Sequence, residues 1–211
     1  MNPIQSFFAG IVALVLTAPI CGIFHAEDSN QLLTINHYVR VKSTVPIIAG
    51  QTAQIYVRER TLAGPALRGS VGADRVVLFV HGAGTPAEVA FDTGYEDYSW
   101  MAYLAREGFD VFCMDVTGYG RSTRPEVMND PRNLTPEQQS SFSPKLLPTP
   151  GGTDYPHTMN TIASDWNDIG AVVDYLRELR HVERVSLIGW SLGGPRAGGY
   201  ASQHPEKVHK L

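Results

Sequence analysis

Three short apolar runs in the last two thirds of the chain are separated by segments with the apolar spacing of helices. The runs are 76–80, 109–115 and 185–188, and the helical segments are 98–107, 159–181 and 195–203. Apolar runs of this length, bounded by turns that contain glycine, are typical of strands buried on both faces. Alternating strands and helices form βαβ units, so the pattern predicts an α/β fold with a mostly parallel sheet flanked by helices.

Two further strands are expected before these runs. Residues 33–41 and 54–59 are rich in β-forming residues and alternate in places between apolar and polar. Gly50 lies between them and is available for a turn, which favours an antiparallel pair. Residues 62–74 contain three glycines and one proline and are expected to form a loop.

The composition bounds the domain count and the classes of partner. With 211 residues and 43% hydrophobic content, the chain can bury one sizeable core. A formal net charge of −4 argues against a nucleic-acid-binding protein, which normally has a basic face. The seven histidines are scattered, and the two cysteines, Cys21 and Cys113, have no paired spacing. We therefore expect no metal site and no cofactor.

The first 26 residues contain no Lys, Arg, Asp or Glu and include an apolar block at 7–16. This pattern fits an export signal, although the basic residues that usually precede the apolar block are missing. Cleavage is expected near Ala26, and the alternatives are an uncleaved anchor that associates the protein with a membrane and a buried core segment. Residues 1–26 are thus predicted to be a signal peptide or membrane anchor, and 27–211 a domain that is secreted, periplasmic or membrane-anchored.

A serine flanked by glycines lies between the last apolar run and the last helical segment. Residues 189–194 read G-W-S-L-G-G, which has the form G-x-S-x-G at a strand-to-helix turn, the position of a nucleophile elbow. Such a turn strains the serine backbone, and side chains two positions away would collide with the strand and the helix. Gly189 and Gly193 remove those collisions. The Ser191 hydroxyl is therefore expected to be exposed at a helix start, where a developing oxyanion is favoured.

The run 76–80 leads into the dipeptide His81-Gly82. Backbone N–H groups of a glycine-bearing loop at this place can converge on one point and supply half of an oxyanion hole. His81 is expected to hold the loop by hydrogen bonding and not to act as a general base, because the histidine that serves an elbow serine follows it in the chain.

The run 109–115 leads into a tight loop with the pattern D-x-x-G-x-G-x-S. Its residues are Asp115, Gly118, Gly120 and Ser122. Neither G-x-G-x-x-G nor a Walker lysine is present, so nucleotide binding is not expected. Asp115 and Ser122 are interpreted as residues that fix the loop.

Residues 124–157 hold seven of the chain's fourteen prolines and are not expected to form a regular packed element. The segment leaves the sheet at the end where Ser191 emerges. Two interpretations stay open, a partial lid over the active site and a surface excursion.

The helix predicted from Met159 has an apolar stripe at Ile162, Trp166, Ile169, Val173 and Leu176. Three acids lie off this stripe: Asp165, Asp168 and Asp174. A solvated helix face is expected for them, and not a catalytic role, since all three precede the elbow serine.

Taken in order and at these separations, the three motifs resemble those of the α/β-hydrolase superfamily, from about residue 33 to the end of the chain. The resemblance implies that Ser191 is the nucleophile and that the backbone N–H groups of Ala83 and Leu192 form the oxyanion hole. It implies a structural part for His81, Gly82, Asp115, Gly118, Gly120, Gly189 and Gly193. The elbow holds a serine and not an aspartate, which disfavours the dehalogenase and epoxide-hydrolase branches. In this respect the chain resembles enzymes that transfer acyl groups from small-molecule esters.

The chain departs from the superfamily pattern after the serine. The catalytic acid and histidine should follow, yet only Glu206, His204 and His209 are available. All three fall at the end of the elbow helix or at the start of a further strand, which 207–211 resembles, and are poorly placed to reach Ser191. We expect an N-terminal part of a serine esterase-like enzyme, inactive by itself. The alternative is a non-catalytic binding protein or a remnant of the fold.

Overall fold

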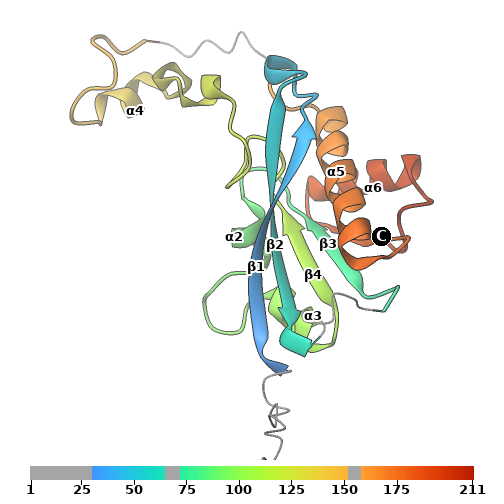
Figure 1. The fold of residues 1–211 in the computed structure, drawn as a ribbon. Coiled ribbons are helices and arrows are strands. Elements are labelled where there is room, and N and C mark those ends of the chain that lie inside the picture. Colours follow the sequence, from blue (N-terminus) through green and yellow to red (C-terminus); the bar gives the residue numbers. More distant parts are fainter. Residues whose placement is uncertain (1–29, 65–71, 152–157) are drawn as a thin grey trace, which may run out of the picture.

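The computed structural model describes residues 30–64, 72–151 and 158–211. Five strands form one sheet within these residues, and helices pack on its two faces (Figure 1). The strands are β1 (Leu32–Lys42), β2 (Thr52–Leu62), β3 (Val76–Val80), β4 (Asp110–Met114) and β5 (Ser186–Gly189). The helices that cover them are α2 (Ala87–Phe91), α3 (Trp100–Arg106), α5 (Ile162–Arg180) and α6 (Gly193–Gln203). All five predicted strands and the three predicted helices are present, and α2 is an addition.

The sheet is mixed, with the order β1-β2-β4-β3-β5. β3 pairs in parallel with both β4 and β5, which confirms the βαβ prediction. β1 and β2 form the expected antiparallel hairpin, connected through a short 3-10 helix, η2 (Pro46–Ile48), and β2 then joins β4 antiparallel. Beside β5, Val208 forms an isolated parallel bridge with Val185, so residues 207–211 run along the sheet as their sequence predicts.

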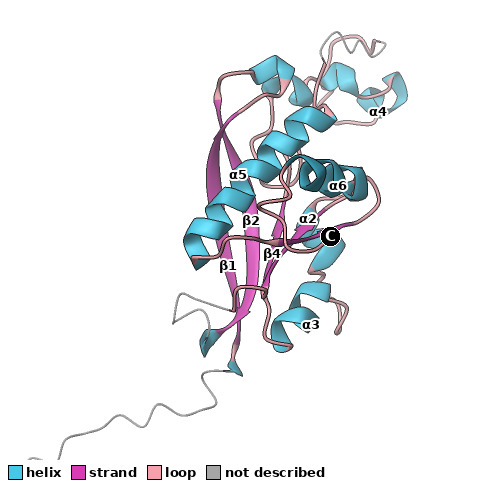
Figure 2. Ribbon diagram, turned by 90° about the vertical axis from the view of Figure 1, so that its right-hand side faces the viewer, coloured by secondary structure: helices cyan, strands magenta, loops and turns pink. Residues whose placement is uncertain are grey.

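Alternate residues of the central strands face the two helical layers. In β3, Leu78 and Val80 belong to a cluster with α5 and α6, whereas Val77 and Phe79 belong to a cluster with α2 and α3. Figure 2 shows α5 and α6 lying over one face of the sheet. Every residue of β3 and β4 is buried, as expected for strands covered on both faces.

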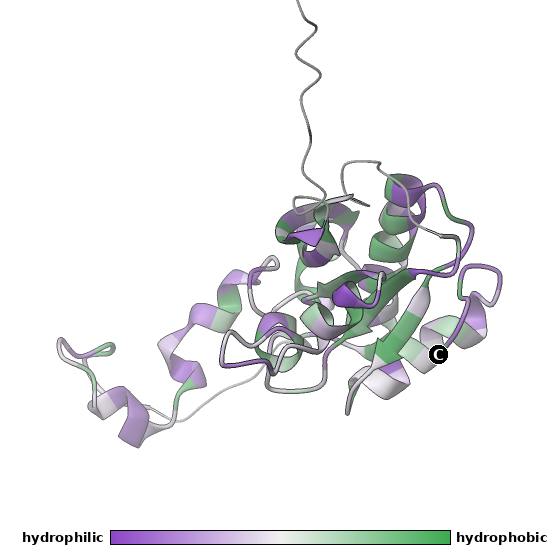
Figure 3. Ribbon diagram, turned by 90° about the horizontal axis from the view of Figure 1, so that it is seen from below, coloured by the Kyte–Doolittle hydropathy of each residue, from purple (hydrophilic) through white to green (hydrophobic). Residues whose placement is uncertain are grey.

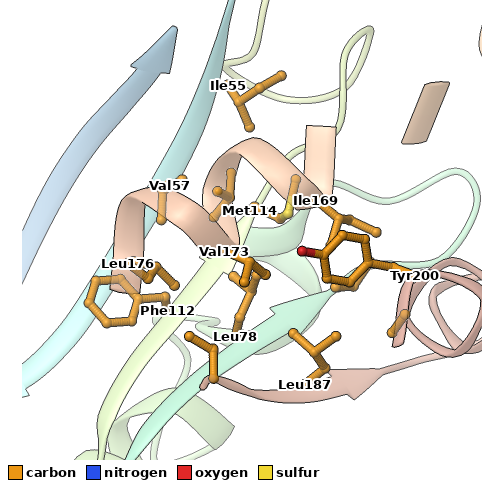
Figure 4. Close-up of a cluster of buried hydrophobic side chains, with 14 of the residues drawn as sticks. Ile55, Val57, Leu78, Phe112, Met114, Ile169, Val173, Leu176, Leu187 and Tyr200 are labelled. Carbon is orange, nitrogen blue, oxygen red and sulfur yellow. The ribbon is translucent and has the colours of Figure 1, made fainter. Parts of the chain in front are cut away.

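The larger cluster lies between the sheet and α5 (Figure 4). Figure 3 shows that the most hydrophobic residues gather on the strands in the middle of the molecule. Fully burying one side chain of this kind contributes about 1.5–3 kcal/mol relative to leaving it exposed. The labelled members in Figure 4 are Ile55, Val57, Leu78, Phe112, Met114, Ile169, Val173, Leu176, Leu187 and Tyr200.

The proline-rich segment is more regular than its sequence predicts. It contains η3 (Glu126–Asn129), η4 (Pro131–Asn133) and α4 (Pro136–Ser140), whose first turn has a capping box at Thr135. The Gln139 side chain donates to the Gly151 carbonyl at 2.9 Å and accepts from the Gly151 N–H at 3.0 Å. The prediction of no regular element was therefore wrong for these short helices, because local caps and one buried amide side chain replace a hydrophobic core. Figures 1 and 3 show the segment extending outward from the sheet.

The predicted signal peptide or anchor at residues 1–26 lies outside the described residues. Within the described ranges, none of the helices has both the length and the apolar character that a membrane crossing requires.

Candidate active site

Ser191 lies in the turn between β5 and α6, and its backbone has the strained geometry expected of an elbow. Its φ of +56° is in the left-handed region, which residues other than glycine rarely adopt. A Cβ atom on Gly189 would lie 2.3 Å from the Gly193 carbonyl oxygen, and one on Gly193 would lie 2.0 Å from the Val80 carbonyl oxygen. Both glycines thus allow β3, β5 and α6 to meet closely, which leaves the Ser191 side chain exposed.

Gly82 brings the loop after β3 against the serine. A Cβ atom on Gly82 would lie 2.8 Å from Ser191 Cβ and 3.2 Å from Ser191 Oγ. The end of β3 and the elbow are also joined by a hydrogen bond from the Trp190 N–H to the Val80 carbonyl, at 3.1 Å. Two of the three sequence motifs therefore meet at the Ser191 hydroxyl.

Ala83 and Leu192, the expected oxyanion donors, follow Gly82 and Ser191 directly. Ala83 is exposed, and Leu192 is the residue that caps the N-terminus of α6. Within the described residues, neither backbone N–H donates a hydrogen bond to another protein group. Both donors are thus available to a ligand, which an oxyanion hole requires.

His81 is fully buried and bonded through both ring nitrogens. Nδ1 lies 2.7 Å from the Gly82 carbonyl oxygen, which can only accept, and Nε2 lies 3.2 Å from the Val116 N–H, which can only donate. The ring is therefore the neutral tautomer that carries its proton on Nδ1. Burial lowers the pKa of His81, which favours the same neutral form. The ring holds two loops together and has no nitrogen left for Ser191.

Asp115 holds the loop that follows β4. Its carboxylate accepts from the Ala87 N–H at 2.7 Å and from the Arg121 N–H at 3.0 Å, and a Cβ atom on Gly120 would collide with it at 1.9 Å. The Ser122 hydroxyl donates to the Asp115 carbonyl at 2.6 Å and accepts from the Tyr56 N–H at 2.8 Å. Gly118, with φ of +90°, lies in the same turn. These contacts fix the loop and leave Asp115 without access to Ser191.

The expected solvated face of α5 is wrong for two of its three acids. Asp165 and Asp168 are buried, at 2% and 0% exposure. Asp168 accepts from the Thr117 N–H at 2.8 Å, and burial raises the pKa of Asp168 to about 6. Only Asp174 is on the surface, where it pairs with Arg177 and Lys207. The buried acids satisfy loop backbone and an arginine, which are partners that helical spacing cannot reveal.

That arginine, Arg196 on α6, is the residue that the sequence interpretation missed. It is 2% exposed and forms an ion pair with Asp165, with 2.7 Å between Nε and Oδ2. Its Nη1 donates to the carbonyl oxygens of His81 at 2.9 Å and Gly82 at 3.1 Å. An arginine five residues after the elbow serine, in a helix built mostly of small residues, was the available signal.

A cavity of about 740 Å³ lies beside the elbow. Its apolar walls include Tyr119, Met128, Met159, Ile162 and Leu192, and the Asp165–Arg196 pair also borders it. This volume falls within the range of small-molecule sites.

The late histidines lie far from the serine. α6 has 11 residues and rises about 16 Å, so His204, which follows it, lies about that far from the elbow. His204 contacts Glu206 at 3.4 Å, and the His209 N–H donates to the Val185 carbonyl beside β5. None of the three residues meets Ser191, as the sequence predicted.

The comparisons with known proteins agree with this architecture. The profile of the family described as alpha/beta hydrolase fold matches residues 75–211. No curated protein matches the chain in sequence.

Several solved structures are similar to the chain at low identity. A proposed lipase from Sulfolobus solfataricus is 21% identical with a TM-score of 0.51, over 84% of this chain and 43% of that one. An epoxide hydrolase from Vigna radiata is 18% identical with a TM-score of 0.48, over 87% and 37%. A bacterial membrane phospholipase A is 18% identical with a TM-score of 0.46, over 83% and 37%. The chain thus spans 37–43% of the length of these structures. With the family profile matched over more than half of its length, the chain belongs to the α/β hydrolase fold family.

Proposed function

We propose that the chain carries the nucleophile of a serine hydrolase that acts on carboxylic esters or related acyl compounds. The observation that carries this proposal is the exposed Ser191 at φ +56°, packed against Gly82 and next to two unbonded backbone N–H groups. A strained backbone at a surface serine persists only where the surroundings hold it, and it is typical of functional sites.

The geometry supports acyl transfer in two steps. Ser191 Oγ attacks the substrate carbonyl carbon while a base takes its proton, and the carbonyl oxygen becomes an oxyanion between the N–H groups of Ala83 and Leu192. Collapse of this intermediate expels the alcohol, which takes up a proton, and leaves an acyl group on Ser191. Water then attacks the acyl-enzyme, releases the acid and returns the proton to Ser191. His81 cannot be the base, because both its nitrogens are bonded to main chain.

The substrate we propose is a small ester with an apolar part. Five apolar side chains line the cavity, among them Met128 within the proline-rich segment and Met159 just after it. An apolar acyl or alcohol group gains free energy by leaving water for such walls, at about 25 cal/mol per Å².

A fluorophosphonate probe tests the nucleophile in the full-length protein expressed from its own gene. We expect covalent labelling of Ser191, identified by peptide mass spectrometry, and hydrolysis of p-nitrophenyl esters. Ser191→Ala should abolish both, whereas Ser202→Ala, which removes an exposed hydroxyl on the same helix, should change neither. A full-length protein that shows neither labelling nor ester turnover would instead support a non-catalytic binding protein of the same fold.

We also propose that the protein is exported, on the strength of the uncharged, apolar residues 1–26. N-terminal sequencing of the fractionated protein tests this. A mature terminus near Glu27 in the periplasm or medium is expected for a signal peptide, and an intact terminus in the membrane fraction for an anchor. An intact terminus in the cytosol would contradict both.

A further inference from the structure

Arg196 contacts the loop that supplies one of the proposed oxyanion donors. Its Nη1 donates to the Gly82 carbonyl at 3.1 Å and to the His81 carbonyl at 2.9 Å. The Gly82 carbonyl also accepts from His81 Nδ1 at 2.7 Å. Two donors from different elements therefore converge on a single carbonyl oxygen.

This carbonyl and the proposed oxyanion donor are parts of the same peptide unit. The Gly82 C=O and the Ala83 N–H share one planar, trans peptide group, in which the two bonds point in opposite directions. Because the carbonyl is directed at the buried Arg196, the Ala83 N–H must point away from it, toward the exposed side of the loop. A charge-assisted hydrogen bond to the carbonyl also polarises the peptide and makes its N–H a stronger donor.

The guanidinium is itself held in one place. Asp165 on α5 accepts from Nε at 2.7 Å, and both side chains of this ion pair are 3% exposed. Asp165 is fixed in turn by Asn160, whose Nδ2 donates to its Oδ1 at 3.1 Å. On the other side, the guanidinium lies over the Tyr119 ring, 5.5 Å from its centre. The planar guanidinium fork is needed here, because it bonds to Asp165 and to the loop at once.

We propose that Arg196 is a positioning residue, which orients and polarises the Gly82–Ala83 peptide so that the Ala83 N–H meets the oxyanion. Asp165 holds Arg196 in place for this purpose. The inference rests on the proposed serine hydrolase function. Arg196 borders the cavity proposed for the substrate and forms no hydrogen bond with Ser191, and in this proposal it acts on the oxyanion through the peptide.

The expected changes in kcat and KM depend on the stage of the reaction at which the oxyanion forms. Its charge develops only in the transition state, so losing the orientation should lower kcat and leave KM nearly unchanged. Removing one oxyanion donor outright lowers kcat by roughly 100- to 1000-fold. Arg196→Ala weakens such a donor without removing it, and we expect kcat to fall by about 10- to 100-fold. Arg196→Lys should fall in between, because one ammonium cannot serve Asp165 and the loop together.

The experiment uses the full-length protein and an ester that the unchanged protein hydrolyses. Arg196→Ala leaves Asp165 buried without its partner, so the double variant Asp165→Ala/Arg196→Ala, which removes both charges, guards against misfolding. The matched control is Arg180→Lys, which weakens another buried arginine–carboxylate pair at the far end of α5. This control should lower the thermal stability and leave kcat unchanged.

Added guanidinium separates positioning from a purely structural role. The cavity beside Arg196 opens the vacated space to small cations, and about 10 mM guanidinium chloride should restore part of the kcat of Arg196→Ala, while sodium chloride at equal strength should not. A folded variant with unchanged kcat, an equal kcat loss in Arg180→Lys, or a loss that guanidinium does not restore would each overturn the proposal. An unchanged protein without any ester turnover would instead contradict the serine hydrolase function itself.

Discussion

At the scale of single residues, the site depends on three glycines that have no side chain. Gly189, Gly193 and Gly82 each occupy a place where a methyl group would lie within 3 Å of another element. Ser191 lies between these glycines and does have a side chain. Its backbone adopts the strained left-handed conformation that this crowding imposes. The strain is therefore a result of three elements meeting at one turn.

This crowding predicts a sharp difference between two adjacent glycines. Gly193→Ala should lower the free energy of unfolding by about 1–3 kcal/mol and displace Ser191, because the new methyl would meet the Val80 carbonyl oxygen at 2.0 Å. Gly194→Ala has nothing within 4 Å of its new methyl and lies in the same helix, so it should be neutral or slightly stabilising. Denaturant unfolding measures both. Equal losses in the two variants would show that α6 does not press against β3.

The sequence predicts this part of the site because backbone sterics are local. The motif Gly-x-Ser-x-Gly by itself indicates the two positions where a side chain cannot be accommodated. The same sequence does not reveal Arg196 or Asp165, because the burial of a charge depends on a partner far along the chain. These two residues are 31 positions apart, and Arg196 lies 114 positions from Gly82.

At the scale of elements, α5 is more than a cover for the sheet. Its apolar residues pack on the strands, and its first turns direct Asp165 at Arg196 of α6 and Asp168 at the loop after β4. The helix begins with a capping box between Thr161 and Ser164 and ends at His181 in the left-handed conformation. Its limits are therefore set locally, which is why its position could be predicted while the environment of its acids could not.

Asp168 predicts a pH dependence of stability. Burial raises its pKa from 3.8 to about 6, so ionisation of the folded protein costs up to about 3 kcal/mol. A raised acid pKa gives a contribution that is complete below about pH 4 and is lost as the pH rises through 6. Asp168→Asn keeps an acceptor for the Thr117 N–H and cannot ionise. The melting temperature of this variant, relative to that of the unchanged protein, should thus rise between pH 5 and pH 8.

Asp174→Asn is the matched control on the same helix. Burial alone would raise the pKa of Asp174, but hydrogen bonds from Lys207 and Arg177 lower it below its usual value. A lowered acid pKa gives stability that is lost only as the pH falls below 4, so this variant should differ from the unchanged protein by a constant amount between pH 5 and 8. If the melting temperatures of both variants changed with pH in the same way, the Asp168 carboxyl would be solvated and its pKa would not be raised.

At the scale of the whole molecule, the N-terminal hairpin is the least predictable part of the fold. Its two strands are evident from alternation, and their mutual pairing from the turn between them. Nothing local indicates that β2 joins β4 antiparallel, because that pairing connects residues as far apart in sequence as Val57 and Met114. The pairing of β2 with β4 is therefore the part of the strand order that the sequence analysis does not predict.

A buried polar cluster joins this hairpin to the rest of the molecule. Arg180 at the end of α5 bonds to Glu59 of β2 at 2.6 Å and also to Asp110 of β4. Glu59 in turn contacts His37 of β1 at 2.7 Å, and Tyr175 bonds to the other nitrogen of that ring at 2.8 Å. Three elements, α5, β2 and β4, thus meet at one guanidinium that faces two buried carboxyl groups, and β1 joins the cluster through His37. Burial, and then the charge of Glu59, raise the pKa of Asp110 to about 7.

Removing this guanidinium should separate the hairpin from α5 in a pH-dependent way. Arg180→Met leaves two buried carboxyl groups without their main partner, so it should lower the free energy of unfolding by about 3–5 kcal/mol at pH 8. Because the raised pKa of Asp110 means that this carboxyl takes up a proton as the pH falls through 7, the loss should be smaller at pH 5. Arg177→Met, which removes a partly exposed partner of Asp174 on the same helix, should cost below about 1 kcal/mol at both values. Urea unfolding at the two pH values measures the difference. An Arg180→Met loss that is equal at pH 5 and pH 8 would mean that the carboxyl pair carries no extra proton, and that Arg180 supports the hairpin by packing on Phe112 alone, whose ring centre lies 5.8 Å away.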